Sequence, residues 1–179
     1  DLPEKRRQDS MTLYHGSNVD IQKIELSKCR PNKDFGKGFY LTSIKEQAER
    51  MALLVSKMYG RTPFVNIYSF NEKVLFGGNL NVRIFEKPSE EWAKFVITNR
   101  NYKRIETVEC DNNFDSRYDI VCGPIANDDL DLLFRQFSDG LISVETLVNE
   151  MEFKKLTDQY SFHTEKALSY LLKTGVENV

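Results

Sequence analysis

The segment Asp34-Phe35-Gly36-Lys37-Gly38-Phe39-Tyr40-Leu41-Thr42 joins a glycine-containing loop to a short apolar strand. The two glycines flank Lys37 and allow another group to approach the backbone closely. An aromatic ring on the following strand can stack on a flat ligand. Taken alone the pattern is weak, because an aromatic residue on a short strand more often belongs to the core.

A second segment, Leu13-Tyr14-His15-Gly16-Ser17, lies upstream. We predict a strand over residues 11–14 and a turn over residues 15–17. The ring of His15 can donate from one nitrogen and accept on the other. The Gly16 backbone offers one donor and one acceptor, which is what a carboxamide requires. A lone His-Gly pair, however, usually marks only a turn.

The rest of the chain predicts a mixture of helices and strands. Residues 29–38 form a loop; strands are predicted over residues 39–42, 64–70, 80–85, 118–122 and 159–163. Helices are predicted after Ser43, Ser89, Asn127, Ser143 and Thr164. Ser43 has capping-box spacing to Glu46, and the last helix is expected to carry Ala167, Leu168, Leu171 and Leu172. There is neither regular βαβ alternation nor a Rossmann glycine fingerprint, so we expect an α+β fold with largely antiparallel sheets.

The composition restricts the classes of protein. The chain has 179 residues, which suits one domain. Its formal net charge is -2, so we expect no general electrostatic binding of nucleic acid. No apolar run reaches the length of a membrane span, and we expect no secretory signal, because residues 1–10 are charged and lack an apolar stretch. We expect residues 1–10 to be a linker, an expression remnant or a tether, and residues 11–179 to form the domain.

Cysteine and histidine usage predicts neither a disulfide framework nor a metal site. The chain has three cysteines, Cys29, Cys110 and Cys122, and two histidines, His15 and His163. The cysteines are odd in number and widely spaced, so we expect ordinary thiols in a reducing, cytoplasmic compartment. Two histidines leave few candidate ligands for zinc.

Taken together and in this order, the two segments are more specific than either alone. "LYHGS", then "FGKGFYLT", then a helix with "EQA", resembles the diphtheria-toxin/PARP-like ADP-ribosyltransferases. That superfamily has a His in a His-Gly-Ser turn, a Tyr after a glycine-x-glycine segment and usually a Glu before a late strand. The resemblance looks closest to an uncharacterised bacterial branch, for which segments like "EWAKFVITNR", "YDIVCGPIAND" and "QYSFHTEKAL" are typical. It covers nearly all of residues 11–172.

The resemblance implies a fold and an activity. The fold would be ADP-ribosyltransferase-like, with two antiparallel β-sheets that form an NAD cleft and with flanking helices. The enzyme would move one ADP-ribose from NAD to a protein or nucleic-acid acceptor and release nicotinamide, with NAD as substrate and no metal. Bacterial relatives of this kind include toxins and effectors, so by analogy we expect an antitoxin or immunity protein as a partner. We expect the protein itself to act in the cytoplasm of the producing cell or of a target cell.

The resemblance also implies residue roles. His15 would hydrogen-bond either the nicotinamide-side ribose or the adenosine ribose, the Gly16 backbone would pair with the carboxamide, and Tyr40 would stack on the nicotinamide ring. The remaining positions implied to bind NAD are Ser17, Gly36, Lys37, Gly38 and Gln47.

The third catalytic position departs from the superfamily, because Gln159 stands where relatives have Glu. A neutral amide can bind a ribose hydroxyl but cannot stabilise positive charge or act as a base. We therefore expect a single transfer, and we expect Gln159→Glu to release nicotinamide at least as fast. In an alternating strand Gln159 would face the cleft, while Tyr160 and Phe162 face the core.

Several alternatives stay open at this point. Asp158 and Glu165 are other candidate acids, and Glu150-Met151-Glu152 imitates the Glu-x-Glu of a different transferase class without its context. His163 is expected to be structural, while Arg100 is either solvated, paired with Asp119 or able to reach a phosphate. The protein could also be an NAD glycohydrolase toxin or a catalytically silent NAD-binding or interaction module.

Overall fold

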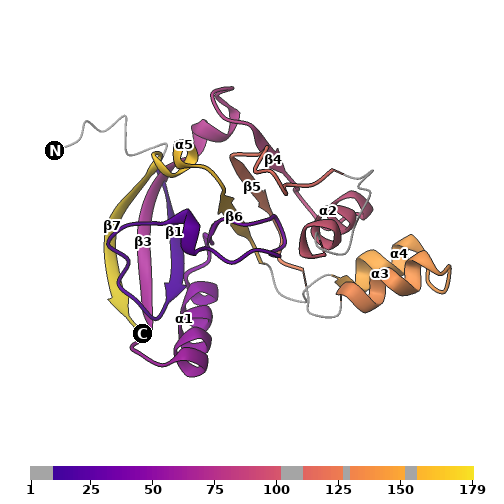
Figure 1. Ribbon diagram of the computed structural model, residues 1–179, viewed down its shortest axis with the longest axis horizontal. Helices are drawn as coiled ribbons and strands as arrows, with labels where there is room; N and C mark the ends of the chain where they lie inside the picture. The colour runs from indigo at the N-terminus through magenta and orange to yellow at the C-terminus, as the bar shows by residue number, and fades with distance from the viewer. Residues whose placement is uncertain (1–9, 102–110, 127–129, 152–156) are drawn as a thin grey trace.

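The structure is a computed structural model that describes residues 10–101, 111–126, 130–151 and 157–179. One sheet contains β1 (Ser10–Ser17), β3 (Phe64–Asn71) and β7 (Leu171–Asn178) in the order β1-β3-β7. Both of its strand pairs are antiparallel. This sheet lies at one end of the molecule, with α1 (Lys45–Tyr59) beside it (Figure 1).

The other sheet has the strand order β2-β6-β5-β4. It contains β2 (Phe39–Leu41), β6 (Gln159–Phe162), β5 (Ile120–Gly123) and β4 (Val82–Ile84). The α+β prediction is confirmed, but the β4–β5 pair is parallel, in contrast to the antiparallel β2–β6 and β5–β6 pairs. The reason is that α2 (Glu90–Arg100) lies between β4 and β5 in the chain, and such a crossover returns the chain to the same end of the sheet.

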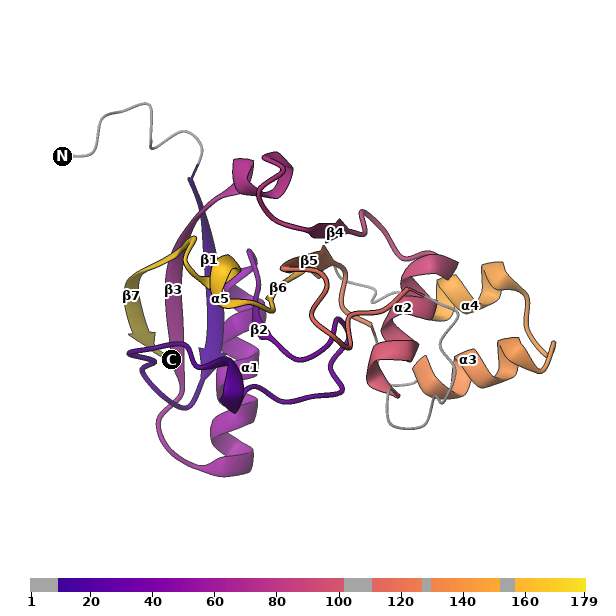
Figure 2. The same cartoon turned by 45° about the horizontal axis from the view of Figure 1, so that its top comes forward.

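Three helices gather at the end of the molecule opposite the three-stranded sheet (Figure 2). They are α2, α3 (Leu130–Ser138) and α4 (Val144–Met151). As predicted, Ser89 caps α2 by accepting from Trp92 N, and Thr164 caps α5 (Glu165–Leu168) by accepting from Ala167 N. Short 3-10 helices cover Leu26–Lys28 and Glu72–Phe76. The predicted cap at Asn127 lies outside the described residues.

The four-stranded sheet has an apolar core on each of its faces. One core lies between the two sheets and includes Leu13, Phe39, Tyr68 and Phe162. The other lies between this sheet and α2 and includes Phe35, Trp92, Phe95 and Val121. Strand alternation therefore sends Phe39 into one core and its neighbour Tyr40 toward the other.

The C-terminus differs from the prediction of a long last helix. α5 ends at Leu168, and the chain then forms β7, which pairs antiparallel with β3. The spacing of Ala167, Leu168, Leu171 and Leu172 imitates a helix. Pairing along the edge of β3 satisfies the backbone of this segment, and the exposed Leu172 alternates with the half-buried Leu171, as in a strand.

Two local predictions around α1 are also wrong. β1 continues through Ser17 and pairs with β3 over its whole length, so no turn interrupts it at residues 15–17. The N-cap of α1 is Ile44 without a side-chain cap, because Ser43 donates instead, from its backbone N–H and its hydroxyl, to the Asp158 carboxylate. A long-range acceptor therefore replaces the predicted capping box.

Gly16 is the point at which α1 touches β1. An added Cβ would lie 2.1 Å from the Ala48 carbonyl oxygen and 2.7 Å from the Ala52 nitrogen. Both are helix backbone atoms, and Ala48 and Ala52 are buried against β1 and β3. The small residues on both elements thus allow the helix to lie directly on the strand.

We predict that Gly16→Ala destabilises the protein by about 1–3 kcal/mol, because α1 must move as a unit to admit one methyl group. The urea midpoint of unfolding measures this. Gly175→Ala is the matched control, since Gly175 also lies in a strand and nothing lies within 4 Å of its added Cβ. Equal midpoints for the two variants would contradict the packing argument.

Candidate functional site

The two sequence motifs meet where the two sheets adjoin. Tyr14 on β1 and Thr42 after β2 form an isolated antiparallel pair, with N···O distances of 2.8 and 2.9 Å. Both backbone groups of Tyr14 therefore point away from β3, and those of Gly16, two residues on, point the same way. The edge of β1 that follows the pair thus faces β2 without continuing the ladder.

The ring of His15 replaces the next rung of that ladder. Its Nδ1 lies 2.6 Å from the Tyr40 carbonyl oxygen, which can only accept, so Nδ1 carries the proton. In a continued ladder this oxygen would accept from the Gly16 N–H. The imidazole donates to this carbonyl instead, and the Gly16 backbone stays directed toward β2 without bonding to it.

His15 is neutral under physiological conditions. Burial lowers its pKa to about 4, opposed by the bond to Tyr40 and assisted by the nearby Lys33. The ring stacks on Phe39 with centroids 4.2 Å apart. With Nδ1 donating, the remaining nitrogen Nε2 is an acceptor, which suits a hydroxyl group.

Tyr40 projects from the opposite face of β2 to Phe39 and is anchored through its hydroxyl. The hydroxyl donates to the Gly36 carbonyl oxygen at 2.5 Å and accepts from the Phe35 N–H at 3.0 Å. Burial, with the negative charge of Asp34, raises the pKa of Tyr40 well above its usual value. The Lys33 ammonium lies 5.6 Å from the ring centroid. His15 and Tyr40 are thus in direct contact, but their rings lie on different sides of β2.

The glycines of the second motif have structural causes, a backbone angle at Gly36 and close packing at Gly38. Gly36 has a φ of 94°, which disfavours other residues, and an added Cβ at Gly38 would lie 2.6 Å from the His163 ring. His163 is buried, and its Nδ1 donates to the Lys37 carbonyl oxygen at 2.8 Å. The Lys37 side chain is exposed, so its backbone has the structural part.

Gln159 lies on the Tyr40 side of β6, as its predicted register implies. Tyr160 and Phe162 pack in the core between the sheets, whereas Ser161 is directly opposite Tyr40. Gln159 itself is buried, with Nε2 2.8 Å from Asp34 Oδ2 and 3.3 Å from the Pro124 carbonyl oxygen.

Asp34 is the residue that the sequence reasoning left without a role. Its buried carboxylate accepts from Arg100 Nε and Nη2, both at 2.8 Å, from Gln159 and, at 3.4 Å, from the Ala126 N–H. Arg100 is therefore paired with Asp34, not solvated or paired with Asp119, which accepts from Asn81 and Thr164. The sequence offered one signal for this role of Asp34, namely that its carboxylate directly precedes an aromatic residue, Phe35.

Two other predicted binding residues are occupied elsewhere. Both ends of the Gln47 amide contact the Asp158 backbone, with Nε2 2.7 Å from its carbonyl oxygen and Oε1 3.4 Å from its nitrogen. The Ser17 hydroxyl accepts from the Val19 N–H at 3.2 Å. The Asp158 carboxylate faces Thr42 and Ser43, away from Gln159.

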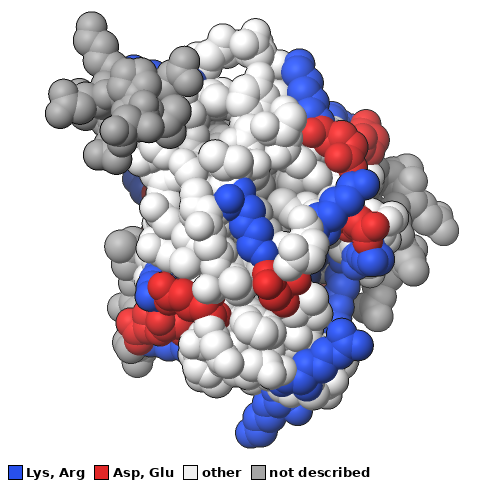
Figure 3. Space-filling model, turned by 90° about the vertical axis from the view of Figure 1, so that its left-hand side faces the viewer, with Lys and Arg blue, Asp and Glu red and all other residues white. Residues whose placement is uncertain are grey.

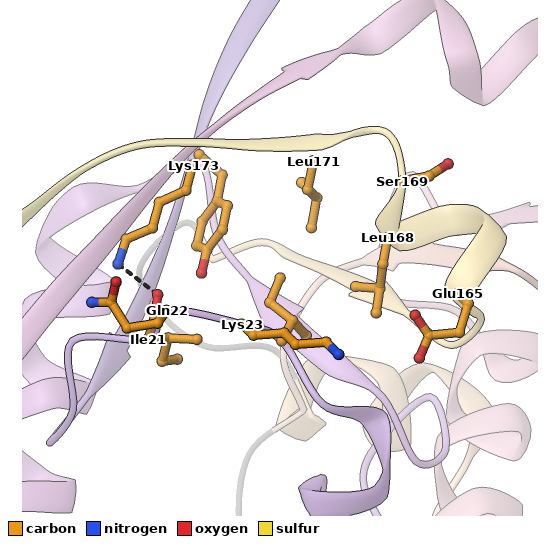
Figure 4. A pocket seen from close by; sticks show the side chains of 10 residues that line it. Ile21, Gln22, Lys23, Glu165, Leu168, Ser169, Leu171 and Lys173 are labelled. Carbon is orange, nitrogen blue, oxygen red and sulfur yellow. Dashed lines mark hydrogen bonds between the residues drawn. The ribbon is translucent and has the colours of Figure 1, made fainter.

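A pocket of about 350 Å³ lies apart from these residues. It is bordered by the segment of Ile21, Gln22 and Lys23 and by residues of α5 and β7 (Figure 4). The Lys173 ammonium donates to the Ile21 carbonyl oxygen at 2.6 Å and so joins the two borders. The pocket shares no residue with the His15–Tyr40 contact.

The described residues show no group of three or more His, Cys, Asp or Glu side chains placed to hold a metal ion. None of the helices in the described ranges is both long and apolar enough to cross a bilayer. On the face shown in Figure 3, basic and acidic side chains are interspersed, so this face does not form a surface of one charge sign. Cys29 and Cys122 are free thiols, and burial raises the pKa of both.

We predict that acid destabilises the protein through its histidines. Burial lowers the pKa of His163 to about 4, against 6.5 in its unperturbed state. The unfolded chain therefore binds more protons between these values, and stability present above pH 6.5 is lost as the pH falls toward 4. As the pH is lowered from about 7.5 to 5.5, the urea midpoint should fall less steeply in His163→Gln than in the wild type. An unchanged slope in this variant would contradict the prediction.

The comparisons with known proteins assign a family. A family model described as "Protein of unknown function (DUF3990)" matches residues 11–172. No curated protein and no solved structure matches the sequence. Since the match spans most of the 179 residues, the chain belongs to the DUF3990 family of proteins of unknown function.

Proposed function

We propose that this protein is an NAD-dependent ADP-ribosyltransferase with an ADP-ribosyltransferase-like fold. It transfers one ADP-ribose from NAD to a macromolecular acceptor and releases nicotinamide. The observation that carries the proposal is the junction of β1 and β2, where the ring of His15 takes the Tyr40 carbonyl and leaves the Gly16 backbone directed toward β2. The two motifs of the resemblance are thus neighbours in space, although 25 residues separate His15 from Tyr40.

The groups at this junction match the needs of a nicotinamide nucleotide. A backbone N–H and C=O on one edge suit a carboxamide, which offers one acceptor and two donors. The Tyr40 ring supplies an aromatic face on one side of β2, and the neutral His15 Nε2 supplies an acceptor for a ribose hydroxyl on its other side. Lys33, beside the Tyr40 ring, adds positive charge toward the phosphates.

In the reaction, the bond between the ribose and nicotinamide breaks, and positive charge develops on the ribose. Positioning of the ribose and polar groups directed at it supply the catalysis. Gln159 contributes a dipole in place of a carboxylate, so we expect a slow enzyme that transfers once.

Incubation with NAD labelled in its adenosine part tests the proposal against its two rivals. Label on a macromolecule in a cell lysate indicates a transferase, free labelled ADP-ribose indicates a glycohydrolase, and intact NAD indicates a silent module. The His15→Asn protein, which keeps a donor for the Tyr40 carbonyl, is the control. Intact NAD after incubation of the wild type with lysate would overturn the proposal.

We predict that His15→Asn lowers nicotinamide release about 100-fold with little loss of stability. The Asn amide can still donate to the Tyr40 carbonyl, as Nδ1 does, but it lacks an acceptor at the position of Nε2. Release is measured by chromatography and folding by the urea midpoint. If folded His15→Asn retains wild-type turnover, Nε2 has no part in the reaction.

We predict that Tyr40→Phe and Tyr40→Ala separate the ring from its hydroxyl. Tyr40→Phe keeps the stacking face but loses the bonds to Gly36 and Phe35, so it should lower the free energy of unfolding by about 1–2 kcal/mol. Its KM for NAD should stay near the wild-type value, whereas Tyr40→Ala should raise it. Equal KM values for Phe and Ala would exclude stacking as the contribution of Tyr40.

A further inference from the structure

The two ends of the Gln159 carboxamide have different surroundings. Nε2 lies within hydrogen-bond distance of Asp34 Oδ2 and of the Pro124 carbonyl oxygen, at 2.8 and 3.3 Å. Among the described residues, Oε1 makes no hydrogen bond, and it is not a fully buried atom. The residue is 8% exposed, so the orientation of its amide is set by the protein and not by solvent.

Both neighbours of Nε2 are obligate acceptors. A carboxylate and a backbone carbonyl cannot donate, so the reversed amide would place its oxygen against two other oxygens without a proton between them. Such a buried, mismatched polar group is costly. The amide therefore has one stable orientation, with its donors toward Asp34 and its acceptor away from it.

Asp34 can impose this orientation because its carboxylate is itself held by other groups. Arg100 holds Oδ1 through two nitrogen atoms at 2.8 Å each, and the side chains of Arg100 and Asp34 are only 20% and 12% exposed. Oδ2 is thereby directed at Gln159 and the Ala126 N–H. The order Arg100–Asp34–Gln159 is thus a chain of donors and acceptors in which each member determines the next.

Gln159 also lies on the face of its sheet that carries Tyr40. It shares a face of β6 with Ser161, which is opposite Tyr40 on β2. An acceptor that is not used by the protein is therefore available on the face that carries the Tyr40 ring.

We propose that Asp34 is a positioning residue that makes Gln159 an acceptor only: it holds the amide so that Oε1, and not the amino group, receives a ribose hydroxyl of NAD. This rests on the proposed function. In this position Oε1 accepts the hydrogen bond that a carboxylate oxygen would accept, but it carries no charge. The consequence reverses the sequence-based expectation for Gln159→Glu. A Glu would place its carboxylate against that of Asp34 at about the present 2.8 Å, so both stability and turnover fall.

Exchanging the two groups tests this arrangement. In Asp34→Asn the oxygen stays with Arg100 and the new amino group faces residue 159, where it opposes the present orientation of the Gln159 amide. Only the Pro124 carbonyl still favours that orientation, and a reversed amide would offer a donor in place of Oε1. We expect the kcat of nicotinamide release to fall about tenfold while KM for NAD changes less than about twofold.

In the double variant Asp34→Asn/Gln159→Glu, the Asn amino group donates to the new carboxylate. Both the urea midpoint and kcat should therefore recover above those of Gln159→Glu. Gln136→Glu, on α3, is the control for added charge.

A second measurement does not depend on turnover. The side-chain amide protons of Gln159 should exchange slowly with solvent in the wild type and at least about tenfold faster in Asp34→Ala. Fast exchange in the wild type, or a wild-type kcat in folded Asp34→Asn, would overturn the positioning role. Slow exchange in a protein that leaves NAD intact would refute the proposed function and with it the ribose contact, while the orientation of the amide would stand.

Discussion

The hydrogen bond from the His15 ring to the Tyr40 carbonyl determines how the two sheets meet. β1 and β2 are edge strands, and their backbones are directed at each other across the Tyr14–Thr42 pair. If the ladder continued, Gly16 would bond to Tyr40 and the two sheets would merge along this edge. The imidazole bonds to the carbonyl instead, so the strands part and the Gly16 backbone does not bond to Tyr40. The ring is neutral at physiological pH, because burial lowers the pKa of His15 to about 4.

A second constraint acts on the other face of the same sheet. The Asp34 carboxylate connects the loop before β2 with α2 through Arg100, with β6 through Gln159 and with the segment after β5 through Ala126. A buried charge with this many donors is stable only as a complete set, since removal of any strong partner leaves an unpaired group. The polar groups that position Gln159 therefore also hold α2 against the sheet, and folding and the proposed chemistry depend on the same contacts.

The glycines of the motifs have structural causes beside any functional one. Gly16 admits α1 onto β1, and Gly38 admits the His163 ring onto the loop. These packing needs would conserve the glycines even in a protein that binds nothing. The distinguishing feature of the site is therefore the arrangement of its hydrogen-bond donors and acceptors around His15 and Gln159, and not the motif letters themselves.

The sequence by itself determined the local elements whose signals lie within a few residues. These include the alternating strands β3 and β6, the Ser89 and Thr164 caps and the placement of Tyr160 and Phe162 in the core. Only the tertiary structure decided the features that depend on distant partners: the parallel β4–β5 pair, the strand β7 in place of a helix, the Asp158 acceptor that replaces a capping box, and the Arg100–Asp34–Gln159 chain. The physical reason is that periodicity and capping act over a few residues of the chain, whereas the pairing of an edge strand or the orientation of a buried amide depends on which group, here as many as 125 residues away, the fold brings beside it.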